Sequence, residues 1–340
     1  MKIAVVGAGA IGAYVGASLA RGGADVHLVA RRDNLKAMRE NGVRVLSERG
    51  DFHVHPSATD DPSEIGPVDV IFLGLKSNSY AGARPLLEPL MGPDTAVVAA
   101  QNGIPWWYFH GHGGPHDGRR IETVDPDGSV SEAIAPERAI GCVAYPATVL
   151  EEPGVVRHLE GTRFSIGEPD RSRSERCERF SEAMVAGGLK CPIEEDLRND
   201  IWVKLMGNVS FNPLSALTRA TMVSICTHEE TRRLVVAMME ELVAVAAALG
   251  YELEISIEKR LAGAEAVGEH KTSTLQDLEA GKDLELAAIV GAVVELADLT
   301  ETDVPSIRAV NAATMLLAET VGQAESAGQQ RVGREATQHA

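Results

Sequence analysis

A lysine and two asparagines recur at four-residue intervals in an otherwise apolar segment. Lys204, Asn208 and Asn212 lie in the stretch DIWVKLMGNVSFNPLSALT, and this spacing would place them on one face of a helix. Buried polar side chains are costly unless they face a polar cavity, a ligand or polar partners. The pattern therefore indicates either a ligand-binding face or a structural hydrogen-bond network between helices.

A glycine motif, GxGxxG, lies near the start of the chain, between a short apolar run and a helical pattern. Gly7 would permit a tight turn, Gly9 would let the backbone approach a pyrophosphate, and Gly12 would let helix and strand pack closely. The free N–H groups of the helix N-terminus would then face the diphosphate. In this context the motif predicts a dinucleotide site, with a bare glycine turn as the alternative. The predicted loop residues are Gly7, Ala8, Gly9, Ala10, Ile11 and Gly12.

The residues after the second apolar run favour a phosphorylated cofactor. The run ends in Val29 and Ala30, followed by Arg31 and Arg32, and Asp33 comes only afterwards. An acidic residue at this position would bind the ribose 2′-hydroxyl of NADH, whereas a guanidinium matches the 2′-phosphate of NADPH. We predict NADPH/NADP+ as the cofactor, with Arg31 at the 2′-phosphate. Two alternatives remain: both arginines are solvated loop charges, or Asp33 selects NADH.

Apolar runs and helical patterns alternate through the first half of the chain, which is typical of a parallel sheet covered on both faces. A helix is predicted at about 172 to 187. The predicted strands are residues 2 to 6, 25 to 30, 68 to 75, 95 to 100, 140 to 144, 155 to 158 and 190 to 193. Between Asn102 and Ile140, two alternating segments around DPDG predict a loop and β-hairpin inserted at about 105 to 138.

From about residue 196 the 3.6-residue period dominates and no strand is predicted. The fold class is therefore α/β, with an N-terminal Rossmann domain containing a parallel sheet and an all-helical C-terminal domain. We expect the Rossmann domain at residues 1–195 and the helical substrate and catalytic domain at 196–324. The polar residues 325–340 are expected to form a frayed tail.

Composition and charge exclude several classes of partner. The net charge of -17 would repel nucleic acid and anionic membrane surfaces. The most apolar helical stretches are interrupted by Glu240, Glu241 and Glu295, so no membrane span is predicted. The N-terminus lacks the pattern of a signal peptide, which predicts a cytoplasmic protein that acts on a small molecule. The helical domain could support a homodimer, and a monomer is equally consistent with the sequence.

No metal site is predicted. His110, His112 and His116 lie in a glycine-rich loop without a nearby carboxylate or cysteine ligand. The four cysteines match no metal or redox spacing, so we expect them to be reduced core thiols. They are Cys142, Cys177, Cys191 and Cys226.

A second polar cluster completes an ordered set of motifs. The stretch HKTSTLQDLEAGKDLE carries Ser273, Gln276, Asp277 and Glu285 in the pattern S-x2-QD-x7-E. It follows GxGxxG, an LK after a predicted strand, a QNG after the next strand, and K-x3-N-x3-N on a helix. This order resembles the ketopantoate reductase (2-dehydropantoate 2-reductase) family over roughly residues 1 to 320.

The resemblance implies NADPH-dependent reduction of 2-dehydropantoate to (R)-pantoate in pantothenate biosynthesis. It implies that Lys204 is the catalytic lysine, which gives a proton to the developing alkoxide. It also implies that Glu285 binds on the substrate or cofactor side and orients Lys204. The family pattern also assigns binding residues for the substrate and for the cofactor. The substrate residues are Asn208, Asn212 and Ser273. At the cofactor, Lys76 and Asn102 would lie near the nicotinamide and its ribose. Ala147 would lie in a loop that contacts the nucleotide.

Three departures from the family pattern leave the substrate open. Thr274 stands where the family usually has methionine, and Leu284 where threonine commonly precedes the glutamate. The third is the insert, whose WWYF run at 106 to 109 would either cap the pocket or form the hydrophobic base of the hairpin. A reductase of a different 2-oxo acid is therefore an alternative. A non-catalytic NADPH-binding regulator is another, against which Lys204 and Glu285 argue.

Overall fold

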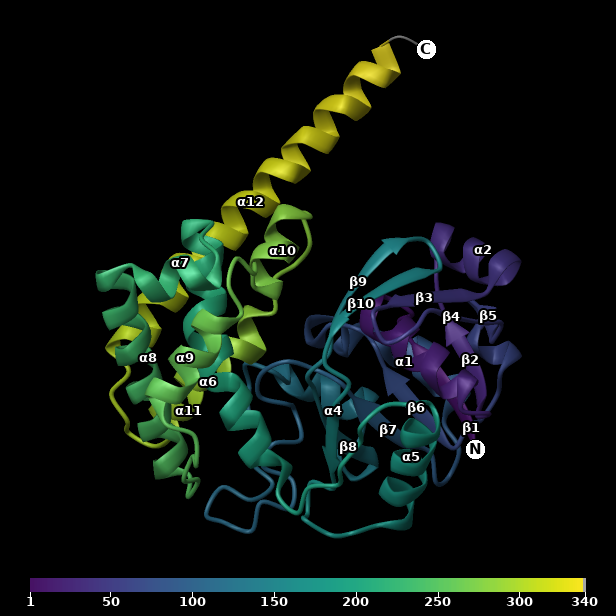
Figure 1. Ribbon diagram of the computed structural model, residues 1–340, viewed down its shortest axis with the longest axis horizontal. Helices are drawn as coiled ribbons and strands as arrows, with labels where there is room; N and C mark the ends of the chain where they lie inside the picture. Colours follow the sequence, from purple (N-terminus) through teal and green to yellow (C-terminus); the bar gives the residue numbers. More distant parts are fainter. Residues whose placement is uncertain (339–340) are drawn as a thin grey trace. The chain divides into compact units, whose positions relative to one another are not determined.

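The computed structural model describes the backbone of residues 1–338 and the side chains through residue 322. The chain divides into two compact units, Met1–Asp200 and Ile201–Ala340 (Figure 1). The predicted boundary at 195/196 lies just before helix α6 (Leu197–Thr218), which begins in the first unit and continues into the second. The tail predicted at residues 325–340 has its backbone in helix α12 (Pro305–Gln338) as far as residue 338, and its side chains lie outside the described part of the chain.

The first unit is built on the predicted parallel sheet. All of its neighbouring strand pairs are parallel except β11 with β8. Strand β1 lies between β2 and β6, so the connections leave it in opposite directions, and a ligand crevice is expected where the strand order reverses. In spatial order the strands are β11 (Phe164–Gly167), β8 (Ala139–Ala144), β7 (Ala96–Ala99), β6 (Val70–Leu73), β1 (Lys2–Val6), β2 (Asp25–Val29) and β5 (Ser57–Thr59).

The central strands are buried on both faces, as their continuous apolar sequences predicted. In β6 and β7 every residue is buried. Helix α1 (Ala10–Arg21) packs closely on the sheet because small residues face the strands: a Cβ on Gly16 would lie 2.6 Å from Leu28 Cδ2. The other α-helices that lie wholly within this unit are α2 (Arg32–Asn41), α3 (Arg84–Leu87), α4 (Ser129–Ala133) and α5 (Glu175–Ala186).

A second sheet, which the sequence analysis did not predict, packs against α1. Its central pair, β3 with β10, is parallel although the two strands are far apart in sequence. The predicted strand at 155–158 is real but belongs to this second sheet. The strands, in order, are β4 (Phe52–Val54), β3 (Val43–Ser47), β10 (Val155–Glu160) and β9 (Ala147–Glu152).

The predicted strand at 190–193 is only partly formed. Its residues make isolated bridges to the β11 region, pairing Arg163 with Lys190 and Ile166 with Ile193. Pro192 lies between these bridges and has no N–H to donate. The segment therefore follows the edge of the sheet without becoming a continuous strand.

The β-hairpin predicted within 105–138 is wrong. The segment contains turns, α4 and short 3-10 helices, η5 (Pro126–Gly128) and η6 (Pro136–Arg138). The cause is Asp125, which is fully buried and accepts hydrogen bonds from the backbone N of Val130 at 2.8 Å and of Ser131 at 3.2 Å. The DPDG sequence therefore leads into a helical turn rather than joining two strands.

The aromatic run is buried at the base of the insert, although the hairpin that it was expected to support is absent. Trp106, Trp107, Tyr108 and Phe109 are each no more than 3% exposed. Trp106 packs edge-on against Tyr80, and its Nε1 donates to the carbonyl of Ile134 at 3.0 Å. The run therefore packs inside its own unit.

Helices alone form the second unit in the part of the chain that the structure describes, as predicted. None of its described helices has both the length and the apolar character needed to cross a bilayer. After α6 come α7 (Met222–Thr227), α8 (Glu229–Ala248), α9 (Ile257–Ala266), α10 (Ser273–Glu279), the π-helical turn η7 (Ala287–Gly291), α11 (Ala292–Leu299) and α12 (Pro305–Gln338).

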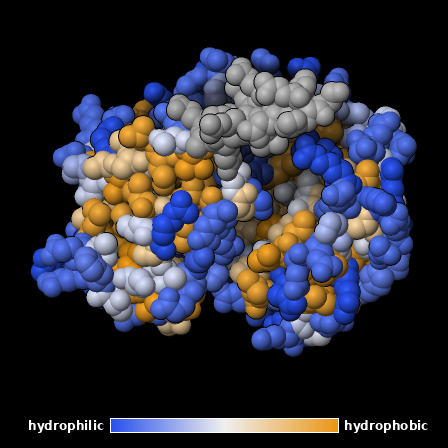
Figure 2. Space-filling view, turned by 90° about the horizontal axis from the view of Figure 1, so that it is seen from above, coloured by the Kyte–Doolittle hydropathy of each residue, from blue (hydrophilic) through white to orange (hydrophobic). Residues whose placement is uncertain are grey.

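Hydrophobic side chains are exposed on one face of the helical unit. Figure 2 shows them gathered among hydrophilic residues. Among the side chains of this unit described through residue 322, the large exposed hydrophobics are Val267, at 45% exposure, Met315 at 42% and Leu316 at 65%. Exposed hydrophobic patches often mark protein–protein contacts. The homodimer itself stays a prediction.

The four cysteines are free and buried. Burial raises the pKa of Cys177 and of Cys191 to about 12, and it also raises the pKa of Cys226. Because the thiolate is the reactive form, we expect no rapid reaction of the native protein with Ellman's reagent at pH 8, and release of all four thiols in guanidinium chloride. Fast labelling of a thiol in the native protein would contradict this burial.

Candidate active site

The glycine loop joins β1 to α1 in a shape that only glycine permits. Gly7 has a φ of +92°, and a Cβ at Gly12 would lie 2.1 Å from the carbonyl oxygen of Gly7. Gly9 is the N-cap of α1, and a Cβ there would meet nothing within 4 Å. The first turn of α1 contains no acidic residue. The helix N-terminus therefore offers backbone N–H groups beside open space, as binding of a pyrophosphate requires.

A hollow of about 180 Å³ lies beside this loop. Arg31, the N-cap of α2, lines it and is exposed, whereas Asp33 is not among its lining residues. The arginine that follows β2 therefore lines the hollow, where a guanidinium would suit a phosphorylated ribose. The lining residues are Gly7, Ala8, Gly9, Val29, Ala30, Arg31, Asn34, Asp60, Leu75 and Leu86.

Asn34 is a residue of this site that the sequence analysis missed. Its Nδ2 donates to the carbonyl of Ala8 at 2.6 Å, and its Oδ1 accepts from the backbone N of Gly154 at 2.8 Å. The side chain thus ties the glycine loop to the turn between β9 and β10. Both partners are backbone groups, so no sequence motif marks the pair.

The structure places Lys76 and Asn102 just past the carboxyl ends of β6 and β7, on the same edge of the sheet as the glycine loop. Gly74, at the end of β6, touches that loop directly: a Cβ there would lie 2.4 Å from the carbonyl oxygen of Gly7. Gln101, another missed residue, closes the turn that carries Asn102 by donating from Nε2 to the carbonyl of Ile104 at 3.2 Å. The loop residues of three adjacent parallel strands therefore meet at one edge.

Ala147 is not in a loop, contrary to the prediction. It is the first residue of β9 and pairs with Glu160 of β10. The prediction failed because the second sheet was not foreseen. Since β9 packs against α1, Ala147 lies in the sheet that covers this helix.

In the helical unit, α6 carries the predicted catalytic face. Lys204, Asn208 and Asn212 follow one another at four-residue intervals along this helix, so their side chains share one face. Lys204 and Asn208 are half-buried, and Asn212 is 5% exposed. Asn212 Nδ2 is buried and has no hydrogen-bond partner among the described residues. A buried donor of this kind is expected where a ligand supplies the acceptor.

Gly207, on the same helix, faces an arginine. A Cβ on Gly207 would lie 2.1 Å from Arg260 Nη2 of α9. The missing side chain thus lets a guanidinium lie against α6, one residue before Asn208 in sequence. Lys204 and Arg260 together bring positive charge to this helix, the sign that an anionic 2-oxo acid requires.

Ser273 and Glu285 lie at the starts of two helical segments. Ser273 is the exposed first residue of α10, whose N-cap is Thr272. Glu285 is half-buried, and its carbonyl accepts from the backbone N of Ile289 at 3.2 Å, at the entry to the π-helical turn. Turns of this kind are rare in proteins, and those that occur are often found at functional sites.

The two departures in this region differ in burial. Thr274 is a buried residue of α10, 3% exposed, whereas Leu284 is half-buried directly before Glu285.

Among the residues with described side chains, no group of three or more His, Cys, Asp or Glu residues is arranged to hold a metal ion.

Comparisons with known proteins match both units. Residues 3–110 match the family model described as ketopantoate reductase PanE/ApbA, and residues 196–321 match its C-terminal counterpart. The chain is 47% identical over 319 residues to a 2-dehydropantoate 2-reductase of Mesorhizobium japonicum, covering 94% of this chain and 98% of that protein.

Solved structures agree with this match. The crystal structure of a 2-dehydropantoate 2-reductase from Geobacter metallireducens has a TM-score of 0.82 at 31% identity, covering 93% of this chain and all of that one (100%). D-mandelate dehydrogenase in complex with NADH and anilino(oxo)acetate has a TM-score of 0.79 at 20% identity, covering 94% and 99% of the two chains. The latter is a likeness of fold.

Proposed function

The chain belongs to the ketopantoate reductase family, and we propose that it reduces 2-dehydropantoate (ketopantoate) to (R)-pantoate with NADPH, a step of pantothenate biosynthesis. The observation that carries this proposal is the match along nearly the whole chain to a curated 2-dehydropantoate 2-reductase. The site supports it, because an anion-binding glycine loop and a Lys-Asn-Asn helix face are both present.

The glycine loop and the strand ends beside it are the residues that would hold the cofactor. Backbone N–H groups at the start of α1 would bind the pyrophosphate, and Arg31 would bind the 2′-phosphate. Lys76 and Asn102 would lie near the nicotinamide and its ribose, and Ala147 would contact the nucleotide. When bound, NADPH supplies the hydride that reduces the carbonyl carbon.

Lys204 is the proposed proton donor. Reduction of a 2-oxo acid breaks the C=O double bond, and the oxygen must gain a proton as the carbon gains a hydride. A lysine ammonium at the carbonyl oxygen stabilises the developing negative charge and then gives up the proton. Glu285 would orient Lys204.

Asn208, Asn212 and Ser273 are the proposed substrate-binding residues. The unused Nδ2 donor of Asn212 would find its acceptor in the substrate carboxylate or hydroxyl. Fixing the substrate against Lys204 in this way converts two bound molecules into a pair aligned for reaction.

Arg31 tests the choice of cofactor. We expect Arg31→Ala to raise KM for NADPH about tenfold, because one charge-assisted contact with the 2′-phosphate is lost, and to leave KM for NADH unchanged. Arg32→Ala is the matched control, since it removes the same charge from the next residue. Equal loss of affinity for both cofactors in Arg31→Ala would contradict a 2′-phosphate contact.

The alternative substrate is a different 2-oxo acid. Burial of Trp106 to Phe109 in the insert removes the aromatic cap that was one ground for it. The departures at Thr274 and Leu284 are the grounds that remain. Initial rates of NADPH oxidation at 340 nm with a panel of 2-oxo acids decide between them. We expect the highest kcat/KM with ketopantoate, whereas equal or higher values with another acid would favour the alternative.

We further propose that the enzyme acts in the cytoplasm.

A further inference from the structure

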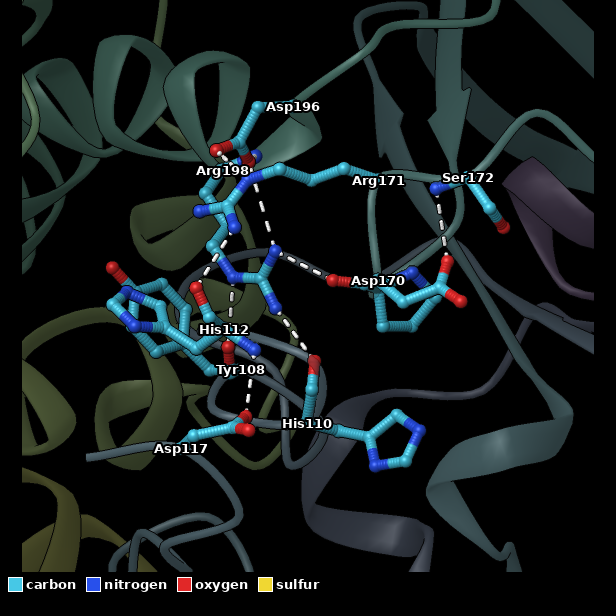
Figure 3. Close-up of polar contacts among 10 residues, drawn as sticks. Tyr108, His110, His112, Asp117, Asp170, Arg171, Ser172, Asp196 and Arg198 are labelled. Carbon is cyan, nitrogen blue, oxygen red and sulfur yellow. Dashed lines mark hydrogen bonds and ion pairs between the residues drawn. The ribbon is translucent and has the colours of Figure 1, made fainter. Parts of the chain in front are cut away.

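The insert that follows Asn102 is held by a buried arginine. Arg198 is 1% exposed and donates to three backbone carbonyls, each at 2.8 Å: Tyr108 from Nε, His110 from Nη2 and Pro169 from Nη1. Figure 3 shows its guanidinium enclosed by these loops. Its cationic carbon also lies 5.6 Å from the ring centres of both Trp107 and Tyr108.

A second arginine and an aspartate extend this arrangement. Arg171 donates to the carbonyl of His112 at 2.8 Å and to Asp196 Oδ2 at 2.7 Å. The other Asp196 oxygen accepts from the backbone N of Arg198 at 3.1 Å and lies 3.6 Å from its Nη1 (Figure 3). We refer to Arg171, Asp196 and Arg198 as the arginine clamp.

Arg198 does not favour the helix in which it lies. It lies in the first turn of α6, where the helix dipole disfavours a cation, and burying a guanidinium is costly unless its donors are satisfied. The insert satisfies these donors with backbone carbonyls at alternate residues: those of Tyr108 and His110 accept from Arg198, and that of His112 accepts from Arg171. Burial, and after it the charges of Arg198 and Arg171, lower the pKa of nearby His112.

The clamp joins the insert to the first turn of α6. The insert continues directly from the turn that carries Asn102, and α6 carries Lys204 about 9 Å along the helix axis from Arg198, at 1.5 Å per residue. The clamp therefore fixes where α6 begins, and with it the axial position of Lys204.

We propose that Arg198 is a positioning residue for Lys204, acting through the first turn of α6. This rests on the proposed function, because it takes Lys204 as the proton donor. A shift of about 1 Å in a catalytic group can cost about 100-fold in rate. Loss of the clamp therefore lowers kcat and leaves the glycine-loop cofactor site intact.

The test compares Arg198→Met with Arg176→Met. Arg176 is a matched control because it also donates to backbone carbonyls, those of Glu137 and Ala139, and pairs with buried Glu168, but it lies on α5. For each protein we would measure Tm, the Kd of NADPH by fluorescence, kcat, and the primary isotope effect on kcat with 4-deuterated NADPH, all well below Tm.

In Arg198→Met we expect kcat to fall about 10- to 100-fold, NADPH Kd to stay within about twofold, and the isotope effect to be no smaller than in wild type. Arg176→Met should lower Tm without lowering kcat. Equal kcat in the two variants, or a smaller isotope effect in Arg198→Met, would overturn the proposal.

Arg198→Lys keeps the charge and can reach fewer carbonyls, so it decides the matter if the methionine variant does not fold. Its kcat should lie between those of wild type and Arg198→Met, and an unchanged kcat would overturn the proposal. The proposed function fails separately, if wild type does not reduce ketopantoate; the same comparison then uses whichever 2-oxo acid wild type reduces.

Discussion

Lys204→Ala is expected to lower kcat for ketopantoate reduction by about 10³-fold, within the range of about 10² to 10⁴ contributed by a positioned general acid. Lys204 is half-buried on the face of α6 that also carries Asn208 and Asn212. Alanine removes the proton donor and the charge that stabilises the developing alkoxide. NADPH affinity should change little, because the glycine loop is untouched.

Lys259→Ala is the control for this variant. Lys259 is an exposed lysine of α9 in the same unit, so its loss changes the net charge equally without removing a proposed catalytic group. Steady-state kinetics with saturating NADPH measures both variants. A Lys204→Ala enzyme that keeps more than about a tenth of wild-type kcat would show that another group donates the proton.

Gly12→Ala is expected to abolish cofactor binding, raising the Kd of NADPH more than about 100-fold. The added Cβ would lie 2.1 Å from the carbonyl oxygen of Gly7 and 3.1 Å from its carbonyl carbon. Both are backbone atoms, so the loop itself must move, and α1 separates from β1. We also expect a lower Tm, because α1 packs into the core of this unit.

Gly9→Ala separates binding from folding. Its Cβ would meet no protein atom within 4 Å, so Tm should stay near that of wild type. The methyl group would occupy the space beside the helix N-terminus, so NADPH binding should weaken. Fluorescence titration and thermal melts of the two variants measure these effects; normal NADPH affinity in both would show that the loop does not bind the pyrophosphate.

Much of the fold follows from local sequence patterns. The central strands of the main sheet are continuous apolar runs, so β1, β6 and β7 could be predicted with their positions in the chain. The second sheet could not, because β3, β4 and β9 are short or rich in polar residues, and because β3 pairs with β10 across more than half of the first unit's sequence. Long-range pairing of this kind leaves no local signal.

Turn chemistry explains the wrong hairpin. DPDG is compatible with a tight turn between strands, but Asp125 accepts backbone hydrogen bonds from Val130 and Ser131 and starts α4 instead. Which outcome occurs depends on the burial of Asp125, which is a tertiary property.

Some residues of the candidate site could likewise be predicted from the sequence, and others could not. Helical spacing alone placed Lys204, Asn208 and Asn212 on one face, and the glycine motif alone located the loop that we propose binds the pyrophosphate. The roles of Ser273, Glu285 and Ala147 came only from the family resemblance. Asn34, Gln101 and Arg198 were missed because their partners are backbone carbonyls and amides, which any sequence provides.

The measurement that tests the central claim most directly is the stoichiometry of the reaction, with pantoate quantified by chromatography beside NADPH consumed at 340 nm. We predict one pantoate formed for each NADPH oxidised when ketopantoate is supplied, and no pantoate from the Lys204→Ala protein on the same time scale. Absence of pantoate with wild type, together with NADPH-dependent reduction of a different 2-oxo acid, would contradict the claim.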